Sequence, residues 1–407
     1  MSYKALKSLI RSRSHRIKST LLVLIIIAGC LPTKAQSLEK KLVVGAERID
    51  QYIEQLQNKN IAIVANATSV VRKSDRNSFT HLVDTLLSRK IAVSKIFSPE
   101  HGFRTTADAG EKVSSGIDPG TGIEIVSLYG KHRKPTKEDL NNVDLILFDI
   151  QDVGVRFYTY IATLQYVMEA AADYEIPMIV LDRPNPNGDI VDGPVMEKEN
   201  TSFLGLQPIP LIYGLTIGEY AYLLTKENWL ETEKSLDLEV IQMVNYDRTH
   251  RYQLPIKPSP NLPNAQSIAL YPSLGLFEGT HINAGRGTTK PFQRYGSKDL
   301  DPTVFSFHYK VASTPGAKYP KQLGEQCYGE DLSQVEVVKK VSLQWLLKAY
   351  HHHKGSFFKS QSFKRHSGQS ALEGMIQSGF TESQIRATWE NDLEAFKVIR
   401  SRHIMYP

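Results

Sequence analysis

The chain of 407 residues carries 49 Lys and Arg against 43 Asp and Glu, a formal net charge of +6, and 41% of its residues are hydrophobic. This length is enough to bury a large core, and it predicts two domains. The first 29 residues hold six basic and no acidic side chains, so the rest of the chain is neutral. Such a balance argues against nucleic acid as a partner.

The amino-terminal segment has the pattern of a bacterial export signal. A basic region precedes a short apolar run at residues 21–28, which is far below the roughly 20 residues that span a bilayer. The sequence Ile-Ala-Gly-Cys at 27–30 resembles a lipobox. We therefore predict a signal peptide at 1–29, lipidation of Cys30, and an exported periplasmic or outer-membrane lipoprotein; ordinary cleavage after Ala35 is the alternative. Lipidated Cys30 leaves Cys327 as the remaining thiol, which excludes an intramolecular disulfide and a thiolate metal cluster.

Short buried strands alternate with helical patterns through the next part of the chain. The predicted strands are residues 61–65, 91–97, 123–128, 145–148, 178–181 and 238–243. The predicted helices are residues 45–58, 79–88, 136–141, 159–173 and 215–225. This alternation predicts an α/β fold with a mostly parallel sheet and right-handed crossovers. Residues 105–122 are predicted to form a long connection or flap, and residues 185–210 an extended segment on the surface.

Polar side chains follow these strands where each one ends. Glu100, His101 and Arg104 follow one strand, and the ends of two others supply Asp149, Gln151, Asp152, Asp182, Arg183 and Asn185. Ligands of open parallel sheets bind beyond the carboxyl ends of the strands, so these residues are expected to converge on a crevice. The alternative is that they serve as turn formers and helix caps.

A second polar cluster lies at residues 275–289, where Glu278, His281, Asn283 and Arg286 stand among four glycines. Glycines allow the backbone to approach a ligand closely, although a solvated turn is the alternative. Beyond residue 291 this clustering thins out, and we predict a smaller domain there. Its last helix starts at a capping box at Thr381 and carries an apolar stripe that is expected to pack in the core.

The dinucleotide, P-loop, zincin and α/β-hydrolase motifs are missing from the sequence. A metal site built from His101, Asp149, Asp152 and His281 has no supporting ligand spacing. Carboxylates with arginines beside them remain, and a pair of carboxyl groups flanking a bond is the usual requirement for glycoside hydrolysis. Glu100 is the first choice for the acid, because it follows a buried strand and a proline. An arginine fork would suit a substrate carboxylate.

Several longer motifs carry a family resemblance. They are SPEHGFR at 98–104, AGEK at 109–112, SLYG at 127–130, FDIQDVGVRFYTY at 148–160, LDRPNP at 181–186, PSPN at 258–261, FEGT at 277–280 and GRGTT at 285–289. Together they span most of residues 60–295, and the chain resembles the exo-β-N-acetylmuramidase (NamZ-type) family. Residues 198–206 and the start of the flap are less typical of that family, which leaves specificity at the rim of the site open.

The resemblance implies a glycosidase that removes N-acetylmuramic acid from non-reducing ends of peptidoglycan fragments, without a cofactor. It implies a Rossmann-like catalytic domain at 40–290 and a smaller α+β domain at 291–407 that completes the cleft. The resemblance implies that Glu100 is catalytic. It does not identify the second catalytic group, for which the candidates are Glu111, Asp149, Asp152, Glu278 and the substrate's own 2-acetamido group. The expected substrate-binding residues are His101, Arg104, Glu111, Gln151, Arg156, Tyr158, Asp182, Arg183, Asn185, Asn261 and Arg286.

Muramic acid has a lactyl carboxylate that glucosamine lacks. Our hypothesis from the sequence is that Arg104 or Arg286 binds this group, because a pocket built around an arginine rejects the unsubstituted sugar. Peptidoglycan sugars and, through a lipid anchor, the membrane are the expected partners. Two competing interpretations are a non-catalytic carbohydrate-binding lipoprotein and a metal-dependent esterase or deacetylase.

Overall fold

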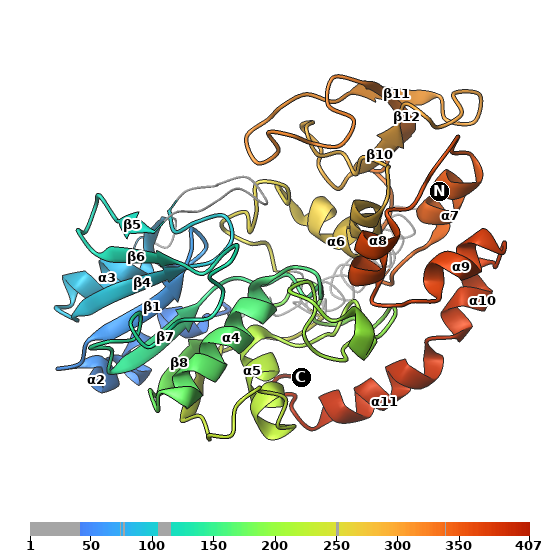
Figure 1. Cartoon of the computed structure of the whole chain (residues 1–407). Helices are drawn as coiled ribbons and strands as arrows, with labels where there is room; N and C mark the ends of the chain where they lie inside the picture. Colours follow the sequence, from blue (N-terminus) through green and yellow to red (C-terminus); the bar gives the residue numbers. More distant parts are fainter. Residues whose placement is uncertain (1–40, 74, 76–77, 105–114, 250–251, 338) are drawn as a thin grey trace, which may run out of the picture. The chain divides into compact units, whose positions relative to one another are not determined.

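The computed structural model describes residues 41–73, 75, 78–104, 115–249, 252–337 and 339–407 (Figure 1). Leu42–Pro407 packs as one unit. Cys30, Glu111 and most of the predicted flap lie outside the described residues, so their predicted roles stay predictions.

A seven-stranded sheet organises the amino-terminal part, with the strand order β5-β6-β4-β1-β7-β8-β9. Its strands are β1 (Ile61–Ala65), β4 (Val93–Ser98), β5 (Gly116–Ile117), β6 (Glu124–Ser127), β7 (Leu145–Asp149), β8 (Met178–Leu181) and β9 (Leu238–Ile241). All neighbours pair in parallel except β5 with β6. Every residue of β1, β7 and β8 is buried, as expected for strands covered on both faces. The predicted α/β fold with a mostly parallel sheet is confirmed.

Helices cover this sheet. They are α2 (Ile53–Leu56), α3 (Leu82–Ser88), α4 (Tyr160–Asp173) and α5 (Ile217–Lys226). Two short 3-10 helices, η1 (Gly45–Glu47) and η2 (Ile49–Gln51), precede α2. Nearly all of α4 is buried, and it packs beside α5, which begins at a capping box formed by Thr216 and Glu219.

Two helix predictions are wrong. Residues 79–81 form strand β3 (Phe79–His81), which pairs with β2 (Val70–Arg72), so α3 starts three residues later than predicted. Residues 136–141 form turns, in which Thr136 donates its backbone N–H to the Asp139 carboxylate at 2.8 Å. Such side-chain bonds compete with helical backbone pairing in short polar segments.

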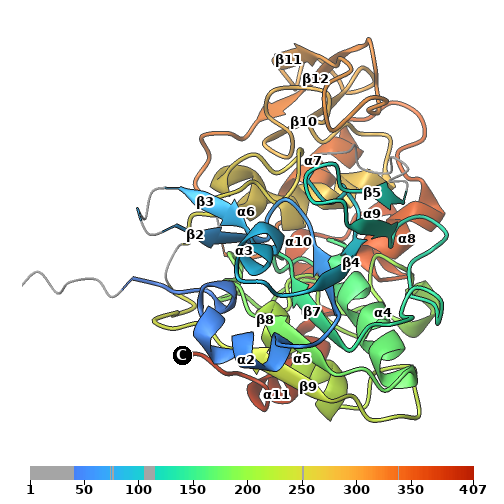
Figure 2. The same ribbon diagram turned by 90° about the vertical axis from the view of Figure 1, so that its left-hand side faces the viewer.

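The carboxyl-terminal part contains several helices and an antiparallel sheet, and this second sheet lies apart from the parallel sheet in both ribbon views (Figures 1 and 2). The antiparallel sheet has the order β10-β12-β11, with β10 (Arg294–Ser297), β11 (Phe307–Lys310) and β12 (Gln326–Asp331). Besides α5, the helices after residue 197 in the described ranges are η3 (Lys198–Asn200), α6 (Ala265–Leu274), η4 (Gly275–Gly279), α7 (Gln344–His351), α8 (Ser360–Ser367), α9 (Leu372–Gln377), α10 (Glu382–Ala387) and α11 (Glu390–Ser401).

The end of the chain returns to the parallel sheet. The capping box at Thr381 is confirmed, but the predicted last helix is split into α10 and α11. The apolar stripe is buried as expected: Ile385, Trp389, Leu393 and Phe396. Tyr406 then donates its hydroxyl to Asp182 at 2.6 Å and accepts a hydrogen bond from Met243 N at 3.0 Å. The carboxyl terminus is therefore bound to residues that follow β8 and β9.

Close packing of η4 against α8 depends on Gly279. A Cβ there would lie 2.8 Å from the backbone nitrogen of Phe363 and closer still to its Cα. We expect Gly279→Ala to lower the free energy of unfolding by about 1–3 kcal/mol, because α8 has to move away. Urea denaturation measures the effect. Gly374→Ala in α9, where nothing lies within 4 Å, is the control and should be neutral or slightly stabilising. Equal effects of the two substitutions would contradict the packing argument.

Candidate active site

A cavity of about 360 Å³ lies beyond the carboxyl ends of the strands, where the two parts of the chain meet. Six of the predicted site residues line it: Glu100, His101, Tyr158, Asn261, Glu278 and Arg286. Residues that follow the strands of the parallel sheet, such as Glu100 and Tyr158, thus meet residues from later segments, such as Glu278 of η4.

Glu100 is held by a sharp turn after β4. His101 and Gly102 both have positive φ, of 73° and 82°, which is unusual for a non-glycine residue and typical of functional turns. Thr159 donates its hydroxyl to Glu100 Oε2 at 3.0 Å, and Tyr160 donates to the Glu100 carbonyl at 3.3 Å. The His101 ring lies 3.2 Å from the Ser259 hydroxyl. The carboxyl group of Glu100 therefore has a fixed orientation at the cavity wall.

Glu278 comes from η4 and has an electropositive environment. Burial favours its neutral form, but the charges of Lys321 and Arg286 outweigh this effect and lower the pKa of Glu278 below its ordinary value. Arg286 Nη1 lies 3.7 Å from Glu278 Oε2, and Glu278 Oε1 is buried without a hydrogen-bond partner. Lys321 donates to the carbonyls of Phe277 at 2.6 Å and Thr280 at 3.1 Å. Glu278 is therefore an ionised carboxylate at neutral pH.

Aromatic rings form much of the remaining wall. Tyr271 packs edge-on against Phe157 and Phe292, with ring centroids 5.0 and 4.7 Å away. Tyr158 is fixed by donating its hydroxyl to the Pro258 carbonyl at 2.7 Å. Rigid aromatic rings therefore stand beside charged and hydroxyl-bearing side chains around the cavity.

His366 enters the cavity from α8. Its Nδ1 lies 2.8 Å from the Ser362 carbonyl, which requires the proton on Nδ1 and leaves Nε2 as an acceptor in the neutral ring. Burial lowers the pKa of His366 and so favours this neutral form. The ring packs against Phe157 at 5.8 Å between centroids.

Asp149 and Arg183 do not line the cavity. They form a bidentate ion pair between the ends of β7 and β8, with Nε–Oδ1 and Nη2–Oδ2 distances of 2.5 and 2.8 Å. Their side chains are 0% and 3% exposed, and Arg183 also donates to the Val70 carbonyl at 3.0 Å. The expectation that they contact substrate is corrected here, because each satisfies the other inside the protein.

Asp182, Asn185 and Gln151 are also bound by the protein itself. Asp182 accepts from Thr216, Gly218 and Tyr406, while burial raises its pKa to about 7. Asn185 donates to the Leu215 carbonyl at 2.8 Å, and Gln151 to the Pro184 carbonyl at 2.6 Å. These three are turn and cap residues, as the alternative interpretation of the sequence holds.

Asp152 and Arg156 lie behind the cavity wall. Asp152 accepts hydrogen bonds from Tyr213 and from Gly154 N, and burial raises its pKa to about 6. Arg156 is 0% exposed and donates to four carbonyls, those of Pro194, Ile209, His366 and Ser367. Arg156 therefore positions the end of α8, which carries His366. The prediction that Arg156 binds substrate is not supported, because its buried side chain does not line the cavity.

Arg104 lies outside the cavity lining. It pairs with Asp84 at 2.5 Å and with Asp118 at 3.2 Å, so the hypothesis that it binds the lactyl carboxylate is not supported. Within the described residues, no group of three or more His, Cys, Asp or Glu side chains is arranged to hold a metal ion. Glu111 belongs to the part of the chain that the structure does not describe.

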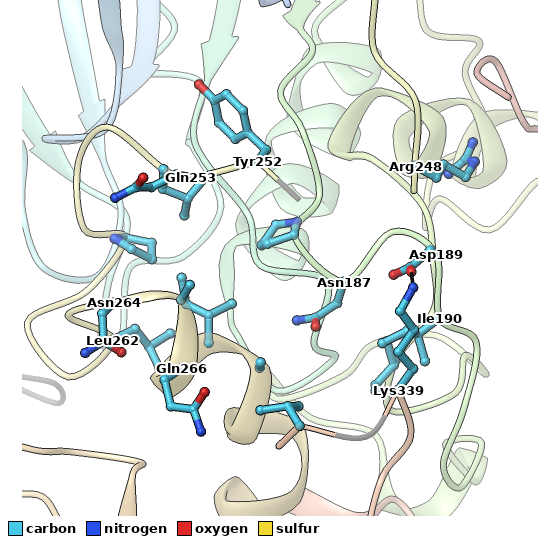
Figure 3. A pocket seen from close by; sticks show the side chains of 18 of the residues that line it. Asn187, Asp189, Ile190, Arg248, Tyr252, Gln253, Leu262, Asn264, Gln266 and Lys339 are labelled. Carbon is cyan, nitrogen blue, oxygen red and sulfur yellow. Dashed lines mark hydrogen bonds and ion pairs between the residues drawn. The ribbon is translucent and has the colours of Figure 1, made fainter. Parts of the chain in front are cut away.

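A second cavity, of about 270 Å³, has Leu262 in common with the first (Figure 3). Amide side chains surround it, and Figure 3 shows Lys339 paired with Asp189 at one side. Arg248, which also lines this cavity, is paired with Glu219. Since Glu100 and Glu278 both line the first cavity, that cavity is the candidate active site.

Reasoning from the sequence missed several lining residues. They are Tyr129, Arg133, Phe157, Thr159, Phe203, Tyr271, Phe292, Arg365 and His366. Phe157 and Thr159 lie inside the longest motif and could have been included. Arg365 and His366 lie in a basic segment without any motif, so their place in the site depends on how α8 packs against η4.

The sequence matches two regions described as exo-beta-N-acetylmuramidase NamZ, the N-terminal region over residues 61–266 and the C-terminal region over residues 269–406. The chain is 39% identical over 399 residues to peptidoglycan beta-N-acetylmuramidase NamZ of Bacillus subtilis, covering 92% of this chain and 94% of that protein. Two DUF1343 family proteins of Bacteroides fragilis have similar crystal structures, with TM-scores of 0.81 and 0.77 and identities of 40% and 28%. Each alignment covers 90% of this chain and 99% of the other. The chain therefore belongs to the exo-beta-N-acetylmuramidase NamZ family.

Proposed function

We propose that this protein is an exo-acting glycosidase that releases N-acetylmuramic acid from the non-reducing ends of peptidoglycan fragments during cell-wall turnover. The similarity to a peptidoglycan beta-N-acetylmuramidase over nearly the whole chain supports this activity. The observation that carries the proposal is that Glu100 and Glu278 line one cavity with aromatic walls. Two carboxyl groups facing one bond are the usual machinery of glycoside hydrolysis.

The environments of the two carboxyl groups favour different roles. Glu278 is kept ionised by Lys321 and Arg286, which suits a nucleophile or a base that activates water. Glu100, oriented by Thr159, then acts as the acid that protonates the leaving oxygen. The buried positions of Asp149 and Asp152 leave Glu278 as the better partner for Glu100 among the described acids.

The reaction is tested with the chromogenic β-glycosides of N-acetylmuramic acid and of N-acetylglucosamine, each with and without a strong chelator. We expect chromophore release from the muramic substrate alone, unaffected by the chelator. Release abolished by the chelator would favour the metal-dependent esterase or deacetylase. No release from either glycoside, with tight binding of muramic acid, would favour the carbohydrate-binding protein.

The role of Glu278 predicts a specific pH dependence. Since cations lower its pKa below the ordinary value of 4.5, the acid-side limb of the kcat/KM profile should lie below pH 4.5. Lys321→Gln removes the largest of these charges but keeps a donor for the carbonyls, so the limb should move to higher pH. Lys359→Gln is the control, with a smaller shift, because the charge of Lys359 lowers the pKa of Glu278 less than that of Lys321. An unmoved limb in Lys321→Gln would contradict the assignment of the base.

We further propose that the protein is exported and anchored by a lipid on Cys30, on the outer side of the inner membrane or on the outer membrane. The basic segment, the apolar run and the lipobox-like residues support this. In the part of the chain that the structure describes, no helix is both long and apolar enough to cross a membrane. Labelling cells with a fatty-acid probe should mark the wild-type protein and leave Cys30→Ala unlabelled; equal labelling would rule out this anchor.

A further inference from the structure

The loop after β6 lies beside the turn that carries Glu100. Strands β4 and β6 are parallel neighbours whose last residues, Ser98 and Ser127, are paired, and Leu128 N donates to the Ser98 carbonyl at 2.8 Å. The chain then turns at Gly130, whose φ is +82°. Because both strands end at the same edge, residues shortly after Ser127 reach the same cavity as Glu100. Two of them line it, Tyr129 and Arg133.

Arg133 differs from the basic residues on either side of it. His132 lies 2.8 Å from Asp139, and Lys134 lies 2.9 Å from Asp173 of α4, so both flanking side chains have carboxylate partners. Across the described ranges, Arg133 forms no ion pair with an acid, and its Nε is buried without a hydrogen-bond partner. A guanidinium that is partly removed from water without an anion is unfavourable unless a ligand supplies one.

The guanidinium has a fixed position. Arg133 Cζ lies 4.4 Å from the ring centroid of Phe203, a stacked arrangement that orients the planar fork. Phe203 stands at the tip of a tight turn closed by two backbone hydrogen bonds between Ser202 and Gly205, of 3.0 and 2.8 Å. The ring also stacks on Tyr166 of α4, with centroids 6.2 Å apart and planes 6° apart. The turn lies in residues 198–206, the segment that departs from the family pattern.

The other cations of the cavity are less suited to bind a substrate carboxylate. Arg286 already neutralises Glu278, and Arg104 is paired outside the cavity. Arg365 lines the cavity but is exposed to solvent, where an ion pair is weak.

We infer that Arg133, stacked on Phe203, binds the lactyl carboxylate of the muramic acid residue and so determines specificity for muramic acid over glucosamine. This inference rests on the proposed function. The contact is a charge-assisted fork between the guanidinium and the carboxylate. The same contact predicts a preference for a free lactyl carboxylate over one that is joined to a peptide through an amide.

The test compares three β-glycosides, those of N-acetylmuramic acid, of its lactyl N-methylamide, and of N-acetylglucosamine. Arg133→Ala should lower kcat/KM on the free acid by about 10- to 100-fold, mainly through KM, while activity on the other two changes little. Phe203→Leu should give a smaller loss with the same selectivity. Lys131→Ala, an exposed residue of the same loop outside the cavity lining, is the matched control and should behave as wild type.

Two results would overturn the inference: an equal loss of Arg133→Ala on all three substrates, or a selective loss in Arg365→Ala with Arg133→Ala unchanged. Calorimetric binding of free N-acetylmuramic acid and N-acetylglucosamine separates this inference from the proposed function. One outcome is that the wild-type protein hydrolyses no glycoside and still binds N-acetylmuramic acid in a way that needs Arg133. This result would support Arg133 as the carboxylate-binding residue and would contradict the proposed glycosidase activity.

Discussion

Replacing Glu100 by glutamine is expected to lower kcat on the muramic acid glycoside by about 100- to 10,000-fold, the range that a general acid contributes. Glutamine keeps the size of the side chain and can still accept the hydrogen bond from Thr159, but it cannot protonate the leaving oxygen. KM should change little, because the cavity wall is preserved. Steady-state kinetics on the purified variant measures both constants.

Glu124→Gln is the matched control for this experiment. Its side chain is 59% exposed on β6, so the substitution should leave both kcat and KM unchanged. Both variants should unfold at the wild-type temperature. A Glu100→Gln protein that turns over at the wild-type rate would remove Glu100 from the chemistry and leave Glu278 without an acid partner.

Arg183→Ala is expected to lower the free energy of unfolding by about 3–5 kcal/mol, the cost of leaving a buried charge without its partner. The substitution removes both hydrogen bonds to Asp149, whose side chain is 0% exposed and has no access to water. The effect should be large because Asp149 ends β7, an interior strand of the sheet whose residues are all buried. Urea denaturation followed by circular dichroism measures it.

Two further variants test this explanation. Arg89→Ala breaks an exposed ion pair with Asp50, whose side chain is 92% exposed, and should cost less than about 1 kcal/mol. The double variant Asp149→Leu with Arg183→Met replaces the buried pair by apolar groups and should recover much of the lost stability. If Arg183→Ala costs no more than Arg89→Ala, the buried pair does not stabilise the sheet.

Strands β1, β7 and β8 could be predicted from the sequence because each is a short apolar run buried on both faces, a pattern that local residues determine. The polar residues at their ends were harder to interpret. Asp149, Asp182 and Glu100 all lie at the carboxyl ends of strands of the parallel sheet. Asp149 and Asp182 nevertheless turn inward, because Arg183 and Tyr406 supply partners there. Which carboxylates face a cavity depends on such partners, and these come from other strands or from the end of the chain.

The basic residues of the candidate site were equally difficult to identify from the sequence. Arg133 stands between two basic residues, and nothing in the sequence distinguishes it from them. Only the positions of Asp139 and Asp173 show that its neighbours are paired and that Arg133 is not. Glu278 and Arg286 could be selected beforehand because they lie in glycine-rich motifs, whereas Lys321 and His366 lie in segments without any motif.

The contact between Tyr406 and Asp182 links distant parts of the sequence at one edge of the parallel sheet. Tyr406 supplies a hydrogen bond at the end of β8, while Arg248 N donates to the carbonyl of Pro407 at 3.2 Å. The buried Asp182 carboxyl also accepts from Thr216 and Gly218, so its full set of donors is assembled only when the segment after α11 has packed against the sheet. Loosening of that segment would therefore leave a buried carboxyl short of a partner, which couples the order of the segment to the order of the sheet edge.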